Sequence, residues 1–250
     1  MREPLLLVGA GLLAGTMNAV AGGGSFVTLP ALMFAGLPSV GANTSSTVAL
    51  CPASLASAWA YREDFKNFDA GVSIRALLTV SLIGSVLGAF LLLLTTSKSF
   101  DIIVPWLLLI GTLVFAFGKK AGDALRRVVH IGPKTVLCLQ FLLGIYGGYF
   151  GGAFGIMMMS VWSLVGVSDI KALNAAKTLV AGATNAIAVV IFIVAGKVWW
   201  PEALIMLVAA VVGGYVGARL ARRVKTEYLR MVIIGINVMM TATIFYRTFG

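Results

Sequence analysis

Lys177 lies inside the apolar run 172–196, in a chain that otherwise keeps its charges in short loops. An ionised side chain at membrane depth costs roughly 2.5–3.5 kcal/mol on insertion scales, so it usually faces a partner, a cavity or a substrate. Helical spacing places Asn174 and Thr178 on the same face as Lys177. A cation beside amide and hydroxyl donors suits an oxyanion, so these three residues are candidate substrate-binding residues. Lys177 could instead extend its long stem to the membrane interface.

Two polar constellations in the N-terminal half could contact the same anion. In the first, the consecutive glycines 22–24 let the backbone approach a ligand closely, and free N–H groups at a helix start favour anions. These glycines could instead permit close helix packing. The second constellation, the run 43–47, has more hydrogen-bonding side chains than a helix cap requires. In a bilayer the surplus must bond neighbouring helices or line a polar cavity, and we favour the cavity.

Further candidate substrate-binding residues come from these two constellations and from one tyrosine in the glycine-rich segment 147–152. The hydroxyl group of this tyrosine could lie in a pocket. They are Asn18, Gly22, Gly23, Gly24, Ser25, Asn43, Thr44, Ser45, Ser46 and Tyr149.

Acidic residues and histidine, which most often carry proton transfer or bind metals, are missing from the apolar segments. All nine acidic residues lie in loops or at segment ends, and the only histidine, His130, lies in a basic connector. Cys51 and Cys138 lie in apolar segments without metal-ligand spacing. We therefore expect no enzyme, no metal site and no cofactor, and no carboxylate placed for proton or cation coupling.

The composition predicts an all-α, multi-pass membrane protein. Of the 250 residues, 60% are hydrophobic and 11% are charged, and a helix needs about 20 apolar residues to span a bilayer. Two short apolar segments, 26–36 and 154–167, each follow a glycine-rich break and are typical of broken or re-entrant helices. Eight longer apolar stretches occur at about 4–21, 44–61, 76–94, 102–118, 135–152, 173–196, 203–218 and 231–246.

The net charge of +10 indicates topology rather than a nucleic-acid partner. Most Lys and Arg residues fall in the loops 62–75, 119–134 and 219–230, which the positive-inside rule places in the cytoplasm. A plain count of eight crossings cannot put all three loops on one side. If each short segment supplies another crossing, the two halves have inverted topology and both termini lie outside.

The two halves also repeat one another in sequence. Gly22 aligns with Gly155, and the block 42–48 aligns with 173–179, so that Asn43 matches Asn174. We therefore divide the chain into a first transmembrane repeat, a basic cytoplasmic connector and a second transmembrane repeat, at 1–118, 119–134 and 135–250.

Pairs of small residues predict where helices pack closely. Gly84 with Gly88 and Gly213 with Gly217 have the spacing that lets two membrane helices approach each other. Packing within the chain is the interpretation we favour, although the Gly84 or Gly213 face could also serve a homodimer.

The order of these motifs resembles that of the TauE/SafE family of sulfite exporters, also called the toluene-sulfonate uptake permease family. The pattern consists of Gly22-Gly23-Gly24, Pro30-Ala31-Leu32, Gly36-Leu37-Pro38, the block Ala42-Asn43-Thr44-Ser45 and a second copy that ends in Lys177. The resemblance covers nearly the whole chain. In the second copy, Gly155-Ile156-Met157 replaces the three glycines, so this break matches the pattern less closely than the first.

This resemblance implies a multi-pass permease of the bacterial inner membrane that moves a small sulfur-containing anion, such as sulfite, sulfoacetate, thiosulfate or an organosulfonate. We expect export, because an anion leaves an inside-negative cell downhill. An organosulfur importer of the same fold and a non-transport membrane assembly factor are the alternatives. The expected partners are the small anionic substrate and the lipid bilayer.

Overall fold

The computed structural model describes residues 4–20, 23–60, 68–125, 132–165, 167, 169–221 and 226–249, and its regular structure in these ranges is entirely helical. The predicted all-α class is therefore confirmed. The described residues form ten helices: α1 (Pro4–Val20), α2 (Ser25–Phe34), α3 (Ser39–Ala60), α4 (Ile74–Leu94), α5 (Ser97–Leu125), α6 (Pro133–Tyr149), α7 (Phe154–Leu164), α8 (Ile170–Val194), α9 (Trp200–Ala221) and α10 (Thr226–Phe249).

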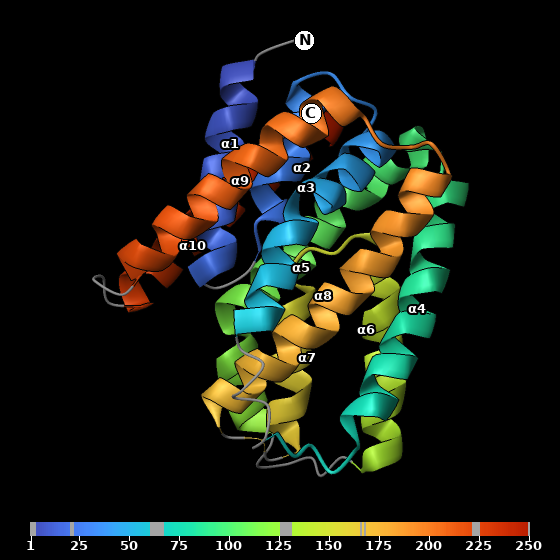
Figure 1. The fold of residues 1–250 in the computed structure, drawn as a ribbon, viewed down its shortest axis with the longest axis vertical. Coiled ribbons are helices and arrows are strands. Elements are labelled where there is room, and N and C mark those ends of the chain that lie inside the picture. Colours follow the sequence, from blue (N-terminus) through green and yellow to red (C-terminus); the bar gives the residue numbers. More distant parts are fainter. Residues whose placement is uncertain are drawn as a thin grey trace.

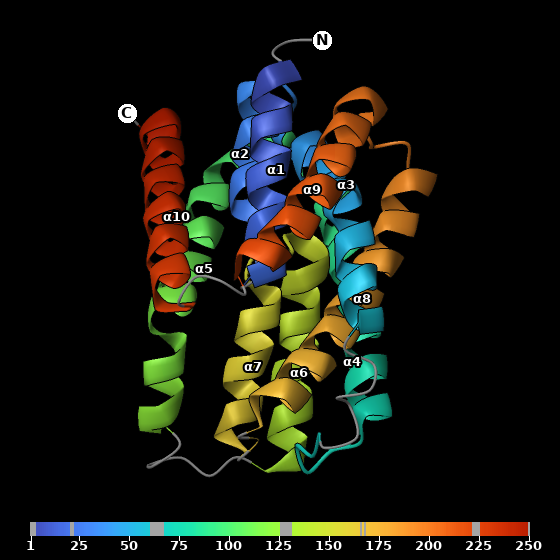
Figure 2. The same ribbon diagram turned by 60° about the vertical axis from the view of Figure 1, so that its left-hand side comes forward.

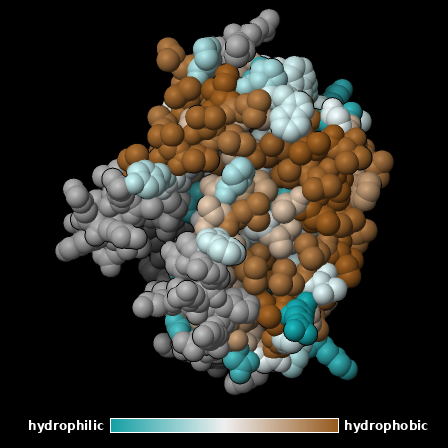
Figure 3. Space-filling view, in the orientation of Figure 1, coloured by the Kyte–Doolittle hydropathy of each residue, from teal (hydrophilic) through white to brown (hydrophobic). Residues whose placement is uncertain are grey.

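Four of these helices contain stretches that are long and apolar enough to cross a membrane, at Ile74–Leu94, Ser97–Gly118, Ala172–Val194 and Met231–Phe249. Several of the others, including α2 and α7, are shorter apolar helices. Large apolar side chains point outward from the bundle: Leu94 and Val194, for example, are 82% and 83% exposed. Figure 3 shows apolar residues covering much of one face of the molecule. Such a surface suits contact with lipid rather than water.

Two helical hairpins form the centre of the molecule. The first consists of α1 and α2, and the second of α6 and α7; the two helices of each hairpin pack against each other. The α1–α2 hairpin descends from the end where both termini lie, whereas α6–α7 rises from the opposite end (Figures 1 and 2). Their tips meet in the middle, where the rings of Phe26 and Phe150 lie edge to face with centroids 6.4 Å apart.

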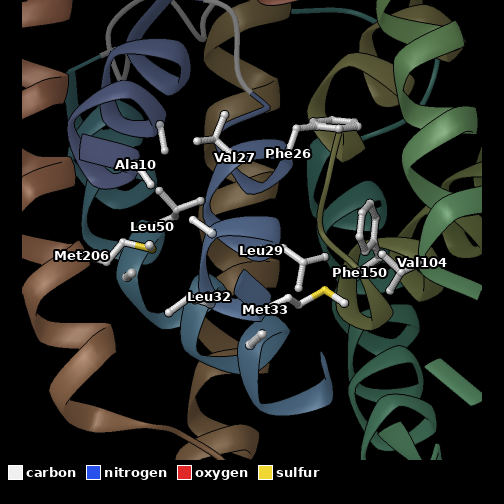
Figure 4. Close-up of a cluster of buried hydrophobic side chains, with 14 of the residues drawn as sticks. Ala10, Phe26, Val27, Leu29, Leu32, Met33, Leu50, Val104, Phe150 and Met206 are labelled. Atoms are coloured by element: carbon white, nitrogen blue, oxygen red, sulfur yellow. The ribbon is translucent and has the colours of Figure 1, made fainter. Parts of the chain in front are cut away.

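The helix α2 is enclosed by protein on all sides. Every residue from Phe26 to Met33 is buried. Figure 4 shows these side chains packed among Leu50 of α3, Val104 of α5, Met206 of α9 and Phe150 of the second hairpin. A short helix that ends at membrane depth must be covered by protein, because lipid cannot bond its terminal N–H and C=O groups. The predicted broken-helix character of this segment agrees with that position.

Glycines bring the first helix of each hairpin into close contact with a long helix. A Cβ atom at Gly15 would collide with the Ala210 carbonyl of α9, and one at Gly88 would collide with the Ile145 carbonyl of α6. Close packing through Gly84, Gly88 and Gly213 is therefore confirmed. Because α6 and α1 of the same chain already cover the Gly84 and Gly213 faces, a homodimer would have to use another surface.

Equivalent helices make equivalent contacts in the two halves. The contact of α1 with α9 matches that of α6 with α4, and the contact of α3 with α9 matches that of α8 with α4. A duplicated unit would give this pattern if α1–α5 corresponds to α6–α10. The starts of α4 and α6, which carry Arg75 and Lys134, lie at the end opposite the two termini (Figure 2). This placement agrees with the prediction that the first two basic loops lie on the same side of the membrane. Residues 222–225 of the third loop lie outside the described ranges. The duplication of the chain stays a prediction.

The predicted match of Gly22 with Gly155 is wrong in position. The helix after the first break begins at Ser25, and the helix after the second begins at Phe154. Gly155 therefore lies inside α7, and the residues of the second break are Gly151, Gly152 and Ala153. Gly151 and Gly152 belong to the glycine-rich break expected before residue 154, whereas Ala153, with φ of +59°, has a conformation usually taken by glycine.

Candidate functional site

A cavity of about 100 Å³ lies where the two hairpin tips meet α3 and α8. The tip of the first hairpin contributes Asn18, Gly23 and Ser25. The second contributes its turn and the start of α7. The remaining wall comes from the middle of α3 and of α8. The full lining consists of Asn18, Gly23, Ser25, Leu50, Ala53, Ser54, Gly151, Ala153, Phe154, Gly155, Ile156, Lys177, Thr178, Ala181 and Asn185.

Two helix N-termini face this cavity. The helices α2 and α7 begin beside it and run toward opposite ends of the molecule (Figure 2). Gly23, with φ of +90°, and Ala153 turn the chain at the two tips. The backbone N–H groups of Ser25, Phe154 and Gly155 make no hydrogen bond within the described residues. Free N–H groups together with the positive ends of two helix dipoles favour an anion at this place.

Asn18 fixes the tip of the first hairpin. Its Oδ1 accepts a hydrogen bond of 2.9 Å from the backbone N–H of Gly24. A Cβ atom at Gly24 would lie 2.7 Å from the Ala14 carbonyl oxygen, so only glycine fits there. Asn18 therefore links the end of α1 to the start of α2 and also lines the cavity.

Lys177 brings a positive charge to the cavity from α8. Its Nζ donates a hydrogen bond of 3.1 Å to Oδ1 of Asn174, one helical turn earlier. Its stem lies over Gly155, where a Cβ atom would be only 3.0 Å from the lysine Cγ and Cδ atoms. No Asp or Glu belongs to the described cavity lining. The side chain thus points into the protein rather than toward the membrane interface.

Ser54 and Asn185 line the cavity on α3 and α8 but were not among the predicted site residues. The amide Nδ2 of Asn185 lies 3.5 Å from Oγ of Ser54, which marks the place where the two helices cross. Asn185 extends the face of α8 that carries Lys177, and this periodicity was the available signal. The same kind of signal was present for Ser54, because it lies eleven positions, or three helical turns, beyond Asn43 and so on the same face of the helix.

The polar run at the start of α3 binds neighbouring segments and does not line the cavity. Nδ2 of Asn43 donates to the Tyr149 carbonyl at 2.9 Å, and Oγ1 of Thr44 donates to the Lys197 carbonyl at 2.6 Å. Oγ of Ser45 accepts a hydrogen bond from the Trp199 N–H at 2.9 Å. Oγ of Ser46 pairs with the hydroxyl of Thr28 on α2. These side chains hold the α8–α9 loop, the second hairpin and α2 in place around the site.

The remaining predicted residues have different positions. Thr178 lines the cavity, although its hydroxyl also donates to the Asn174 carbonyl. Asn174 contacts Lys177 from outside the lining, and Tyr149 donates its hydroxyl hydrogen to Oγ1 of Thr95 at 3.3 Å. Gly22 lies outside the described residues. The structure therefore brings together Asn18, Gly23, Ser25, Lys177 and Thr178 at one cavity.

Comparison with known proteins finds similarity to proteins named as probable membrane transporters. The chain is 29% identical over 256 residues to the "Probable membrane transporter protein YfcA" of Escherichia coli K12, covering 100% of this chain and 93% of that protein. It is 28% identical over 243 residues to a "Probable membrane transporter protein" of Haemophilus influenzae, covering 96% and 94%. No solved structure matches the chain. The family model described as "Sulfite exporter TauE/SafE" matches residues 7–244, so the chain belongs to the TauE/SafE family of membrane transporters.

Proposed function

We propose that the protein is a permease that moves a small sulfur-containing anion out of the cell through the central cavity. The observation that carries this proposal is a cavity lined by Lys177 and by two helix N-termini, with no acidic residue in its described lining. Ser25, Ser54 and Asn185 add hydroxyl and amide groups that can bond anion oxygens. The sulfur chemistry is supported by the description of the family.

The volume of the cavity favours a compact substrate. A space of about 100 Å³, with Lys177 and several hydroxyl and amide groups in its lining, suits a compact polar anion. Sulfite, thiosulfate and sulfoacetate are compact enough to be held by Lys177 and both helix starts. An aryl sulfonate would need an additional apolar pocket for its ring. We therefore propose a small oxyanion rather than an aromatic sulfonate.

The single most direct test is anion flux into and out of proteoliposomes, measured with sulfite and thiosulfate. Lys177→Met should abolish flux while the protein keeps its thermal stability, because the variant removes the charge and keeps an apolar stem. Lys98→Met is the matched control, since Lys98 is an exposed residue in the first turn of α5. Unchanged flux in Lys177→Met would contradict the proposed site. Flux in the inward direction alone, under equal gradients, would favour an importer.

A further inference from the structure

The positive charge that the cavity presents can be estimated from three features. Lys177 contributes one unit. The N-termini of α2 and α7 lie at the cavity, and a helix N-terminus acts as roughly half a positive charge. The total is therefore about two positive charges. Because no Asp or Glu occurs in the described lining, nothing there offsets it.

These three features can act on one anion at the same time. The N–H of Ser25 comes from the first hairpin and those of Phe154 and Gly155 from the second, and none of the three has a hydrogen bond within the described ranges. Lys177 lines the same cavity from α8, and its stem lies over Gly155. All three features belong to the lining of the same cavity, so one anion there can lie within reach of each of them. Their charges therefore add at a single binding position.

We propose that this site is built for a small divalent oxyanion and discriminates against monovalent anions of similar size. The inference rests on the proposed function and specifies its substrate class. Unbalanced charge is strongly unfavourable in a protein interior, where water cannot compensate for it. A divalent anion balances the charge of Lys177 and both helix N-termini. A monovalent anion leaves about one positive charge without a partner.

The test compares two anions that differ mainly in valence. Sulfoacetate is divalent at pH 7.5, and isethionate has the same sulfonate and two-carbon skeleton with a neutral hydroxymethyl group in place of the carboxylate. Binding of each to the purified protein is measured by isothermal calorimetry, and uptake of each by proteoliposomes is measured in parallel. The wild type should bind sulfoacetate at least about tenfold more tightly than isethionate. Thiosulfate and methanesulfonate provide a second pair with the same difference in charge.

Variants of the lysine separate the charge from the fold. Lys177→Met should reduce the preference for sulfoacetate to less than about threefold, because about half of the positive charge is lost. Lys177→Arg keeps the charge and should retain the preference, even if the larger guanidinium group weakens the binding of both anions. Lys98→Met should match the wild type, since it removes a lysine that does not line the cavity.

Three results would overturn the inference in distinguishable ways. Equal binding of the divalent and monovalent anions by the wild type would refute the valence preference but leave the proposed permease intact. Failure of all four anions to bind a folded protein would refute the proposed anion site itself. An unchanged preference in Lys177→Met would show that the discrimination does not come from this charge.

Discussion

At the residue scale, the cavity combines side chains that are far apart in the sequence. Ser54 and Asn185 approach each other at the crossing of α3 and α8 although 131 positions separate them. Both side chains are neutral, so each would form a weaker hydrogen bond to an anion than the ammonium group of Lys177 would. Their position next to Lys177 and the two helix starts makes them the polar wall of the site. The anion should therefore contact this wall directly.

Cysteine labelling can test whether Ser54 faces the anion. In a background with Cys51 and Cys138 replaced by serine, Ser54→Cys should react with a small methanethiosulfonate reagent, and saturating sulfoacetate should slow that reaction. The matched control is Ser81→Cys, because Ser81 is fully buried and its hydroxyl is bonded to Gln140 outside the cavity. Mass spectrometry measures the labelling rates. Labelling of Ser54→Cys that sulfoacetate does not slow would place the anion elsewhere.

At the scale of the elements, the position of α2 depends on a contact at its far end. Nη1 of Arg247, in the last turn of α10, lies 3.3 Å from the Met33 carbonyl at the end of α2. Its guanidinium carbon also lies 5.3 Å from the centre of the Phe34 ring. A cation at the C-terminus of a helix stabilises the helix dipole, and stacking on a ring adds to the attraction. Arg247 therefore helps to hold the helix whose N-terminus faces the cavity.

Replacement of Arg247 should loosen α2 without altering the cavity wall. We expect Arg247→Gln to lower the free energy of unfolding by about 1 kcal/mol and to weaken anion binding severalfold. Arg247→Lys should recover part of both losses. Thermal unfolding with and without sulfoacetate measures the two effects. A structural role alone would lower stability and leave the affinity of the folded protein unchanged. That outcome would show that Arg247 does not contribute to anion binding.

The sequence predicted the elements better than it predicted their contacts. The helical class, the short buried helix after the first glycine break and the inward position of Lys177 follow from hydropathy and from the cost of a charge in lipid. The role of the run 43–46 could not be predicted in the same way, because the same residue types serve to form hydrogen bonds with neighbouring segments and to line a polar cavity. Ser54 was missed although it lies on the same helix face as Asn43, and its place in the cavity wall follows from the α3–α8 crossing. The cavity is a product of tertiary packing.

At the scale of the whole molecule, two hairpins enter from opposite ends and meet at one cavity (Figure 2). Glycine contacts join α1 to α9 and α6 to α4, so each hairpin is packed closely against a long helix of the other half. This arrangement gives each end of the molecule its own barrier above or below the anion. If the predicted inverted repeats are present, movement of one hairpin with its partner helix would expose the cavity to one side at a time.

The absence of a described carboxylate at the cavity leads to a prediction about energy coupling. An inside-negative potential drives an anion outward by about 2.3 kcal/mol per charge per 100 mV, and a divalent anion would gain about twice as much. We therefore expect sulfoacetate efflux from proteoliposomes to increase when a potassium gradient with valinomycin makes the interior negative, and to persist after a protonophore removes any proton gradient. Efflux that needs a proton gradient and ignores the potential would contradict this mechanism. Lys177→Met vesicles, which should show no efflux under either condition, control for leakage.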